Sequence, residues 1–211
     1  MTRIPARPIL LAAALLCLLS LPSAAFERKS FDRSRFARPD FTDPAIAAKP
    51  ATAPNASPAR PAEPDPGLVE LFGNSLLTAK GEPADLASLN GKTIALYFSA
   101  SWCPPCRAFS PILVDVADHL RQSGKPFELV LVGRDPSEEK ALAYMAAHNM
   151  TGFLVPPEAD ANRALCDRYG VRGIPALVVV DSSARTIDPS ARGTVQSAHG
   201  DPDAVWAQWS R

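Results

Sequence analysis

The chain has 211 residues and carries 22 Lys and Arg side chains against 22 Asp and Glu, so its formal net charge at pH 7 is 0. This balance argues against a general nucleic-acid or polyanion binder, because such proteins carry an excess of basic side chains. No segment resembles a P-loop or a dinucleotide-binding glycine fingerprint, so we expect no nucleotide cofactor.

The first 25 residues have the pattern of a signal peptide. Arg3 and Arg7 give a positive start, residues 9–19 form an uninterrupted apolar run, and small residues follow at 23–25. We therefore expect cleavage near Ala25 and a secreted or periplasmic mature chain. An uncleaved anchor is the alternative, although the apolar run is short for a bilayer span.

Residues 26–66 are expected to form a disordered arm and linker. Phe recurs every five residues over 26–41, with Arg two places after the first three rings. This step fits neither the helical nor the strand period, so the rings cannot share one face. Residues 26–41 are therefore either a tether or a weak contact for a membrane surface or a partner. The Pro and Ala content of 44–66 predicts an extended spacer.

Residues 67–211 are expected to form a single folded domain of the α/β class. In chain order we predict short elements at 68–72, 75–78 and 85–89, a strand at 93–98, a helix at 103–122, a strand at 127–132, helices at 137–148 and 160–169, a strand at 176–180 with 185–187 beside it, and a helix at 201–209. The strands are recognised by continuous apolar runs, and the helices by apolar residues at helical spacing and by caps. Alternating strands and helices imply a mixed sheet that is covered on both faces.

The chemistry of the chain concentrates at Cys103 and Cys106, between the strand at 93–98 and the following helix. A Cys in the first turn of a helix lies near unsatisfied N–H groups and the positive end of the helix dipole, which lowers its pKa. Pro104 and Pro105 suit the same turn, where a missing N–H costs little. A bridge across two residues closes a very short loop and would add little stability. The pair therefore indicates thiol–disulfide exchange rather than a structural disulfide.

Residues 97–107, Tyr-Phe-Ser-Ala-Ser-Trp-Cys-Pro-Pro-Cys-Arg, resemble the thioredoxin superfamily and look most like its tryparedoxin and nucleoredoxin branch. Three other segments agree in family order: Pro111 after the cysteines, Leu-Val-Gly-Arg-Asp at 131–135, and Val-Arg-Gly-Ile-Pro-Ala at 171–176. The resemblance covers roughly residues 67–209. It implies a thioredoxin-like fold, with a central mixed β-sheet flanked by helices.

The resemblance also implies roles for individual residues. Cys103 would be the nucleophile, and Cys106 would resolve the mixed disulfide that Cys103 forms. Pro175 would be a cis proline opposite the cysteines, leaving the backbone of Ile174 free to pair with an extended substrate segment. Trp102 would be either a partly exposed lid on the sulfurs, which we favour, or a core residue.

Several positions near the cysteines leave alternatives open. Thioredoxins usually carry a buried Asp six residues before the first Cys, where this chain has Tyr97, as in the tryparedoxin branch. Asp135 is a candidate for the missing carboxylate, with a helix-capping or solvated Asp as the favoured alternative. Arg107 either lowers the pKa of Cys103 or is a solvated helix residue. Cys166 is either a second resolving thiol or, as we favour, a small buried core residue.

We therefore expect a secreted or periplasmic thiol–disulfide oxidoreductase that reduces disulfides of partner proteins through its CPPC dithiol. A disulfide oxidase or isomerase, and a non-catalytic metal- or peptide-binding module, are the alternatives. No metal or other cofactor is expected. Turnover then requires an external thiol donor, and in a bacterium a membrane thiol carrier is the candidate.

Overall fold

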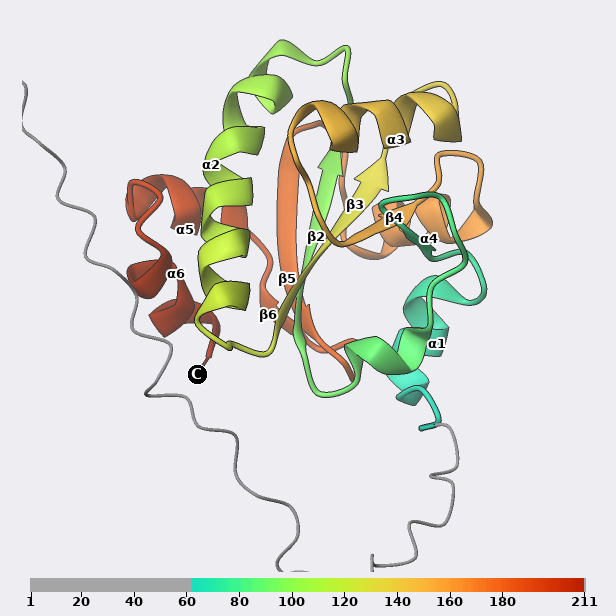
Figure 1. Cartoon of the computed structure of the whole chain (residues 1–211), viewed down its shortest axis with the longest axis horizontal. Helices are drawn as coiled ribbons and strands as arrows, with labels where there is room; N and C mark the ends of the chain where they lie inside the picture. The colour runs from blue at the N-terminus through green and yellow to red at the C-terminus, as the bar shows by residue number, and fades with distance from the viewer. Residues whose placement is uncertain (1–61, 211) are drawn as a thin grey trace, which may run out of the picture. The chain divides into compact units, whose positions relative to one another are not determined.

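The computed structural model describes residues 62–210, and Figure 1 shows their arrangement. The predicted signal peptide at 1–25 and the Phe- and Arg-containing segment at 26–41 lie outside the described residues. The predicted linker at 26–66 lies outside them up to residue 61. Within 62–210, no helix has both the length and the apolar character needed to cross a bilayer.

A mixed sheet occupies the centre of the described residues, with six strands in the order β1-β4-β3-β2-β5-β6. The strands are β1 (Leu77–Thr78), β2 (Thr93–Ser99), β3 (Phe127–Gly133), β4 (Phe153–Val155), β5 (Ala176–Asp181) and β6 (Thr186–Asp188). Strand β2 pairs in parallel with β3 and antiparallel with β5, while β3 pairs in parallel with β4. Strands β1 and β6 pair antiparallel with β4 and β5. The predicted mixed sheet is thus confirmed.

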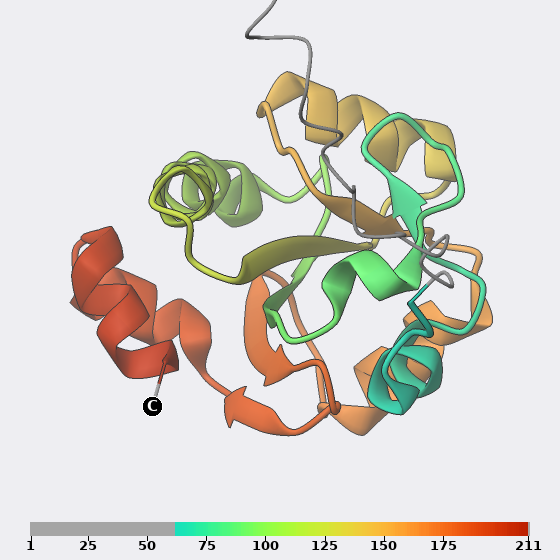
Figure 2. The same cartoon turned by 60° about the horizontal axis from the view of Figure 1, so that its bottom comes forward.

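Helices cover both faces of this sheet. They are α1 (Pro66–Phe72), the 3₁₀ helix η3 (Leu86–Leu89), α2 (Pro104–Gln122), α3 (Glu138–Ala147), α4 (Asp160–Arg168), α5 (Ala191–Ser197) and α6 (Pro202–Trp209). Figures 1 and 2 show α2, α5 and α6 on one side of the strands and α1 and α4 on the other. The buried residues of α3 join those of α2, α5 and α6 in one core.

Strand β2 separates the two cores because successive side chains of a strand point to opposite faces. Ala95 and Tyr97 pack in the core under α2 and α3, whereas Leu96 and Phe98 pack in the core under α1 and α4. All four side chains are fully buried. The end of β2 is therefore held from both sides, which gives the residues that follow it a fixed starting point.

Two elements were not predicted from the sequence. Strand β4 has only three residues, and it exists through its pairing with β3 and β1. Helix α5 contains Gly193 and Thr194, which are weak helix formers, and it is anchored by buried Ala191 and Val195. Both elements depend on tertiary contacts more than on local propensity.

Candidate active site

The two cysteines lie where β2 leads into α2. Cys103 is the N-cap of α2, and its Sγ accepts a hydrogen bond from the backbone N–H of Cys106 at 3.3 Å. Pro104 and Pro105 open the helix and are both exposed, at positions that need no backbone N–H. The cysteines form a disulfide with a Cα–Cα distance of 5.2 Å. Local sequence thus places a disulfide on the N-terminal turn of a long helix.

The two members of this disulfide differ in exposure. Cys103 exposes 4 % of its surface, whereas Cys106 is fully buried. Ala100 is fully buried beside them, and the half-buried Ile174 packs against the same small cluster. An incoming sulfur therefore meets Cys103 first.

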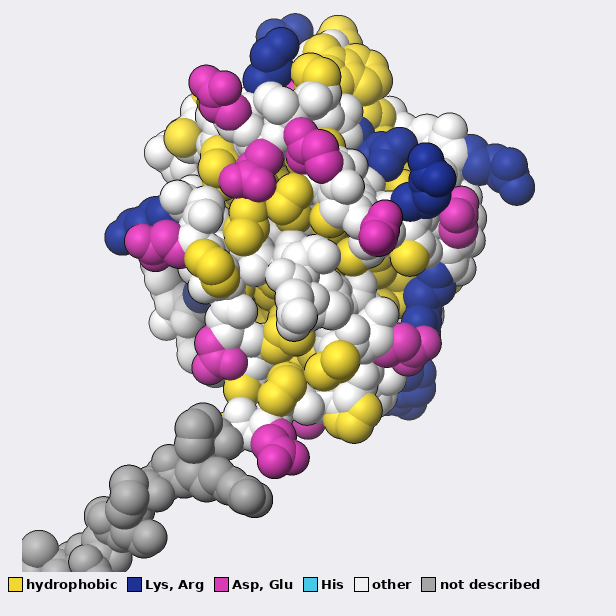
Figure 3. Space-filling model, turned by 90° about the vertical axis from the view of Figure 1, so that its right-hand side faces the viewer, with side chains coloured by type: hydrophobic (Ala, Val, Ile, Leu, Met, Phe, Trp, Pro, Cys, Tyr) yellow, Lys and Arg dark blue, Asp and Glu magenta, His cyan; other side chains and the backbone are white. Residues whose placement is uncertain are grey.

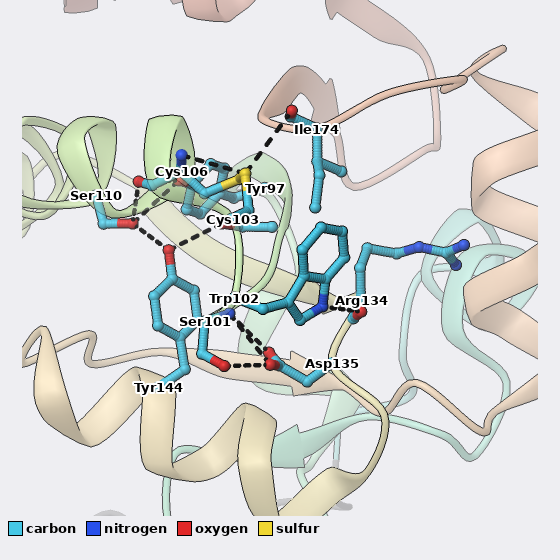
Figure 4. The surroundings of a disulfide bond; sticks show 11 residues. Tyr97, Ser101, Trp102, Cys103, Cys106, Ser110, Arg134, Asp135, Tyr144 and Ile174 are labelled. Carbon is cyan, nitrogen blue, oxygen red and sulfur yellow. Dashed lines mark hydrogen bonds between the residues drawn. A yellow bond between two sulfur atoms is a disulfide. The ribbon is translucent and has the colours of Figure 1, made fainter.

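The segment before β5 lies against Cys103. Because β5 runs antiparallel to β2, with Phe98 opposite Ala176, the start of β5 lies beside the end of β2. The Ile174–Pro175 peptide bond is cis, and the Ile174 carbonyl oxygen lies 3.8 Å from Cys103 Sγ. Figure 4 shows this carbonyl directed at the disulfide. The arrangement brings together two segments that are about 70 residues apart in the chain.

Trp102 stands at the surface next to the disulfide. Its side chain is 61 % exposed, which does not fit the core-packing alternative. Its indole N–H donates a hydrogen bond to the Arg134 carbonyl oxygen at 3.1 Å, just after β3 (Figure 4). The ring is therefore held by the backbone of a neighbouring strand end.

The surroundings of Asp135 match neither of the two expectations, which were a carboxylate that takes the place of the usual thioredoxin Asp and a helix-capping or solvated Asp. It is buried, with 4 % of its surface exposed, and it accepts hydrogen bonds from the Ser101 backbone N–H at 3.1 Å and the Ser101 hydroxyl at 2.6 Å. Among the described residues, its hydrogen bonds all go to Ser101. The carboxylate thus holds the loop that leads into Cys103. It is neither solvated nor a helix cap, and no hydrogen bond joins it to a cysteine.

A network of buried hydroxyl groups lies on the inner side of Cys106. The Tyr97 and Ser110 hydroxyls donate to the Cys106 carbonyl oxygen at 3.1 and 3.0 Å. The Tyr144 hydroxyl lies 2.6 Å from Ser110 Oγ and 2.9 Å from Ser99 Oγ. Burial raises the pKa of Tyr97 well above its ordinary value, so this hydroxyl stays protonated. Neutral donors therefore surround the position where a carboxylate is usual in thioredoxins.

Sequence reasoning identified Tyr97 but missed its partners. Ser110 follows Cys106 by four residues, so it lies on the same helix face, and this spacing was an available signal. Tyr144 comes from α3, and nothing local to residues 97–110 indicates that it reaches them.

Two recesses open beside the disulfide. The first, the Trp102 recess, has a volume of about 250 Å³ and is lined by Trp102, Arg134, Cys166, Arg172 and Ile174, among others. The second, the α3 recess, has a volume of about 460 Å³ and is lined by Ser101, Arg107, Lys140, Tyr144 and His148, among others. The exposed Arg107 therefore forms part of the wall of the α3 recess, and no ion pair joins it to another described residue.

Cys166 is half-buried and carries a free thiol. It packs against the edge of the core under α1 and α4 and also lines the Trp102 recess, so it is only in part the small buried core residue that we favoured. Burial raises the pKa of this thiol. At neutral pH it is therefore a weaker nucleophile than an ordinary exposed cysteine.

A family model and the sequences of known proteins both match this chain, and they indicate the same family. Residues 90–186 match a family model described as thioredoxin-like. Bovine nucleoredoxin is 35 % identical over 124 residues, which cover 58 % of this chain and 28 % of the relative. Probable nucleoredoxin 1 of Arabidopsis thaliana is 37 % identical over 128 residues, covering 60 % of this chain and 22 % of the relative. The chain thus matches less than a third of the length of these nucleoredoxins.

The alignments with solved structures span nearly the whole of those proteins and about two thirds of this chain. Tryparedoxin II from C. fasciculata is 37 % identical with a TM-score of 0.58, over 65 % of this chain and 91 % of that protein. A tryparedoxin II complexed with glutathionylspermidine is 36 % identical with a TM-score of 0.57, over 65 % of this chain and 94 % of that protein.

The expected location of the protein needs correction. The nucleoredoxin relatives are intracellular proteins, and this finding overturns the secreted or periplasmic location. It also leaves the signal peptide at 1–25 without support. The expectation was wrong because a basic start and a short apolar run are a local compositional pattern, which does not by itself determine the compartment.

Proposed function

Because this chain belongs to the thioredoxin superfamily, in its tryparedoxin and nucleoredoxin branch, we propose that it is a thiol–disulfide oxidoreductase that reduces disulfides of partner proteins. Its nucleoredoxin and tryparedoxin relatives are thiol–disulfide oxidoreductases. The single observation that carries the proposal is the Cys103–Cys106 disulfide on the first turn of α2, with Cys103 as the less buried member.

In the reduced protein, the Cys103 thiolate attacks one sulfur of a partner disulfide. A bond forms between Cys103 Sγ and that sulfur, and the partner S–S bond breaks, leaving a thiolate on the second partner sulfur. The Cys106 thiol then loses its proton and attacks Cys103 Sγ, which releases the first partner sulfur as a thiolate. The partner gains two electrons and two protons, and the protein is left with its own disulfide.

The local geometry supports Cys103 as the attacking group. The N-terminal turn of α2 places the positive end of the helix dipole at its sulfur. The Cys106 N–H, 3.3 Å away, can stabilise a negative charge there. Both effects favour a negative charge on Cys103 Sγ in the reduced state.

The segment around Ile174 is proposed to hold the partner chain. Its carbonyl lies 3.8 Å from Cys103 Sγ, and Pro175 follows it without an N–H. An extended partner segment can pair with this backbone, as in β-augmentation. Trp102, exposed beside it, offers a flat apolar surface for the same segment.

A thiol donor is needed to regenerate the dithiol. Thioredoxin-like proteins act on disulfide substrates with thiol donors, and a tryparedoxin II has been solved in complex with glutathionylspermidine. We propose a low-molecular-weight thiol or a protein dithiol as the donor. A membrane thiol carrier was expected for a bacterial host, where it would serve an exported chain, and it is not proposed. The division into 1–25, 26–66 and a domain at 67–211 also stays a proposal, as do the oxidase and isomerase directions.

The test uses the full chain with dithiothreitol as the donor and insulin as the disulfide substrate. Cys103→Ser should abolish catalysed reduction, and Cys106→Ser should accumulate a mixed disulfide between Cys103 and the substrate, visible by non-reducing electrophoresis. Cys166→Ser is the matched control and should keep its turnover. Undiminished turnover in Cys103→Ser would contradict the proposal. A stoichiometric metal complex without any disulfide reduction would favour the binding-module alternative.

A further inference from the structure

We propose that the disulfide lies in a two-part cationic site that selects partner segments with carboxylates on both sides of the target disulfide. The two parts are the Trp102 recess and the α3 recess. This inference rests on the proposed function and names the substrate class of the same site.

The Trp102 recess provides the first part. Ile174 lines it, and the Ile174 carbonyl lies 3.8 Å from Cys103 Sγ, so the recess shares a residue with the surroundings of the reacting sulfur. Arg134 and Arg172 line it as well, and no Asp or Glu side chain does. A partner segment that extends over Ile174 would therefore bring its next side chains to two guanidinium groups.

The α3 recess provides the second part. Ser101 and Arg107 line it, and in the chain they bracket the two cysteines. Lys140 and His148 come from the facing side of α3 and its end, and again no Asp or Glu side chain lines the recess. Figure 4 shows Tyr144, which lines this recess, and Ile174 on different sides of the cysteine pair.

The fixed cations of the two recesses are not neutralised by the protein. In the described part of the chain, no ion pair is formed by Arg107, Arg134, Lys140 or Arg172. Arg134 donates a hydrogen bond to the neutral side-chain oxygen of Asn162 at 2.6 Å. By contrast, three arginines elsewhere each contact a carboxylate, namely Arg121, Arg168 and Arg185.

The carboxylates near the two recesses are outnumbered by these four cations. Asp135 is buried and bonded to Ser101, and Glu139, exposed on α3, forms no ion pair with Lys140. Asp167, next to Cys166, does not line the Trp102 recess. Figure 3 shows dark blue Lys and Arg side chains and magenta Asp and Glu side chains interspersed over one face of the molecule, with magenta side chains near the top as well as lower down.

The local charge contrasts with a formal net charge of 0 for the whole chain. A distant anion therefore experiences little attraction, whereas a carboxylate near the disulfide meets four unpaired cations. Such focused charge raises the rate of encounter with a complementary partner, and salt weakens the effect. The preference should therefore appear in kcat/KM and should depend on ionic strength.

The experiment compares three disulfide peptides that differ only in the residues flanking the disulfide: Asp on both sides, Ser on both sides, or Lys on both sides. The full chain reduces each peptide with dithiothreitol as the donor, at low salt and at about 0.3 M salt. We expect kcat/KM to fall from Asp to Ser to Lys, with about a tenfold span at low salt that contracts at high salt.

Variants assign the effect to the recesses. Arg172→Glu and Arg107→Glu, and the milder Arg172→Gln and Arg107→Gln, should each reduce the Asp-to-Lys ratio. Lys125→Glu is the control with the same change in charge as the Glu variants. It lies beyond the far end of α2, about 28 Å along the helix from Cys103. It should leave the ratio unchanged.

The outcomes separate this inference from the proposed function. Reduction of all three peptides at equal rates at both salt concentrations overturns the inference and leaves the function standing. An equal loss of preference in Lys125→Glu also overturns it, because overall charge would then explain the selection. No reduction of any peptide refutes the proposed function itself.

Discussion

The two sides of the Cys103–Cys106 disulfide differ sharply. On the outer side, Cys103 faces the Ile174 carbonyl and the exposed Trp102 ring. On the inner side, Cys106 is fully buried, and its carbonyl accepts hydrogen bonds from two hydroxyl groups. Two cysteines in one helical turn thus have opposite environments. The comparison teaches that burial, more than sequence spacing, determines that Cys103 is the sulfur that meets partners while Cys106 stays in the protein interior.

The largest expected effect is on the reactivity of the two thiols. In the reduced protein, Cys103 should be alkylated by iodoacetamide on the order of 100-fold faster than Cys106, because Cys103 is the less buried of the two and caps the N-terminus of α2. Mass spectrometry of peptides after brief labelling measures both rates in one sample. Equal labelling rates for Cys103 and Cys106 would contradict the difference that we infer between the outer and inner sides.

A second effect concerns the loop at Ser101, which leads into Cys103. Asp135→Ala leaves the Ser101 N–H without its acceptor, and we expect the free energy of unfolding to fall by about 2 kcal/mol. Urea unfolding of the oxidised protein measures this change. Asp203→Ala, at an exposed position, is the control and should change stability by less than about 0.5 kcal/mol. A loss no larger than that of the control would show that the buried carboxylate does not hold the loop.

A third effect tests the inner side. Tyr144→Phe removes the hydroxyl that joins Ser99 to Ser110, and we expect a loss of about 1 kcal/mol in unfolding free energy. Tyr169→Phe is a matched control. Its buried hydroxyl has no hydrogen-bond partner of good geometry in the described chain, although it lies in the field of Arg168. The control should be near neutral, so equal losses in the two variants would argue against a stabilising network.

The smallest effect concerns Cys166. Burial raises its pKa in the folded state above its value in the unfolded chain, so thiolate formation is suppressed by folding. Its contribution to stability is therefore complete below the unfolded pKa and is lost as pH rises through the folded pKa. We expect labelling of Cys166 to be slower than that of Cys103 at pH 7 and to increase several-fold above pH 9. A rate that is flat with pH would contradict this assignment.

Much of the fold was predictable because its central elements are locally encoded. The apolar run at 93–98 is strand β2, and the cysteine motif lies at the start of α2, as predicted. Strand β4 was missed because three residues carry no clear period. Residues 1–25, which led to the expected export, lie outside the described residues.

The site was predictable only where its residues are neighbours in the chain. Asp135 was placed near the cysteines by resemblance, but its contact with Ser101 follows from strand register. Ser99 pairs with Gly133 in the parallel strands, so residues two places further on lie side by side. Tyr144 reaches Ser110 only because α3 packs beside α2. Neither contact can be read from local sequence.

The antiparallel direction of β5 has a consequence for the whole reaction centre. Strands β2 and β3 both end at the disulfide, whereas β5, which has six residues, begins there. If β5 ran the other way, its first residue would lie about 20 Å off, at the opposite edge. The apolar layers would survive this inversion, yet Ile174 would never meet Cys103. The antiparallel direction of β5 thus makes the difference between a scaffold that is only stable and a scaffold that can also bind a partner segment.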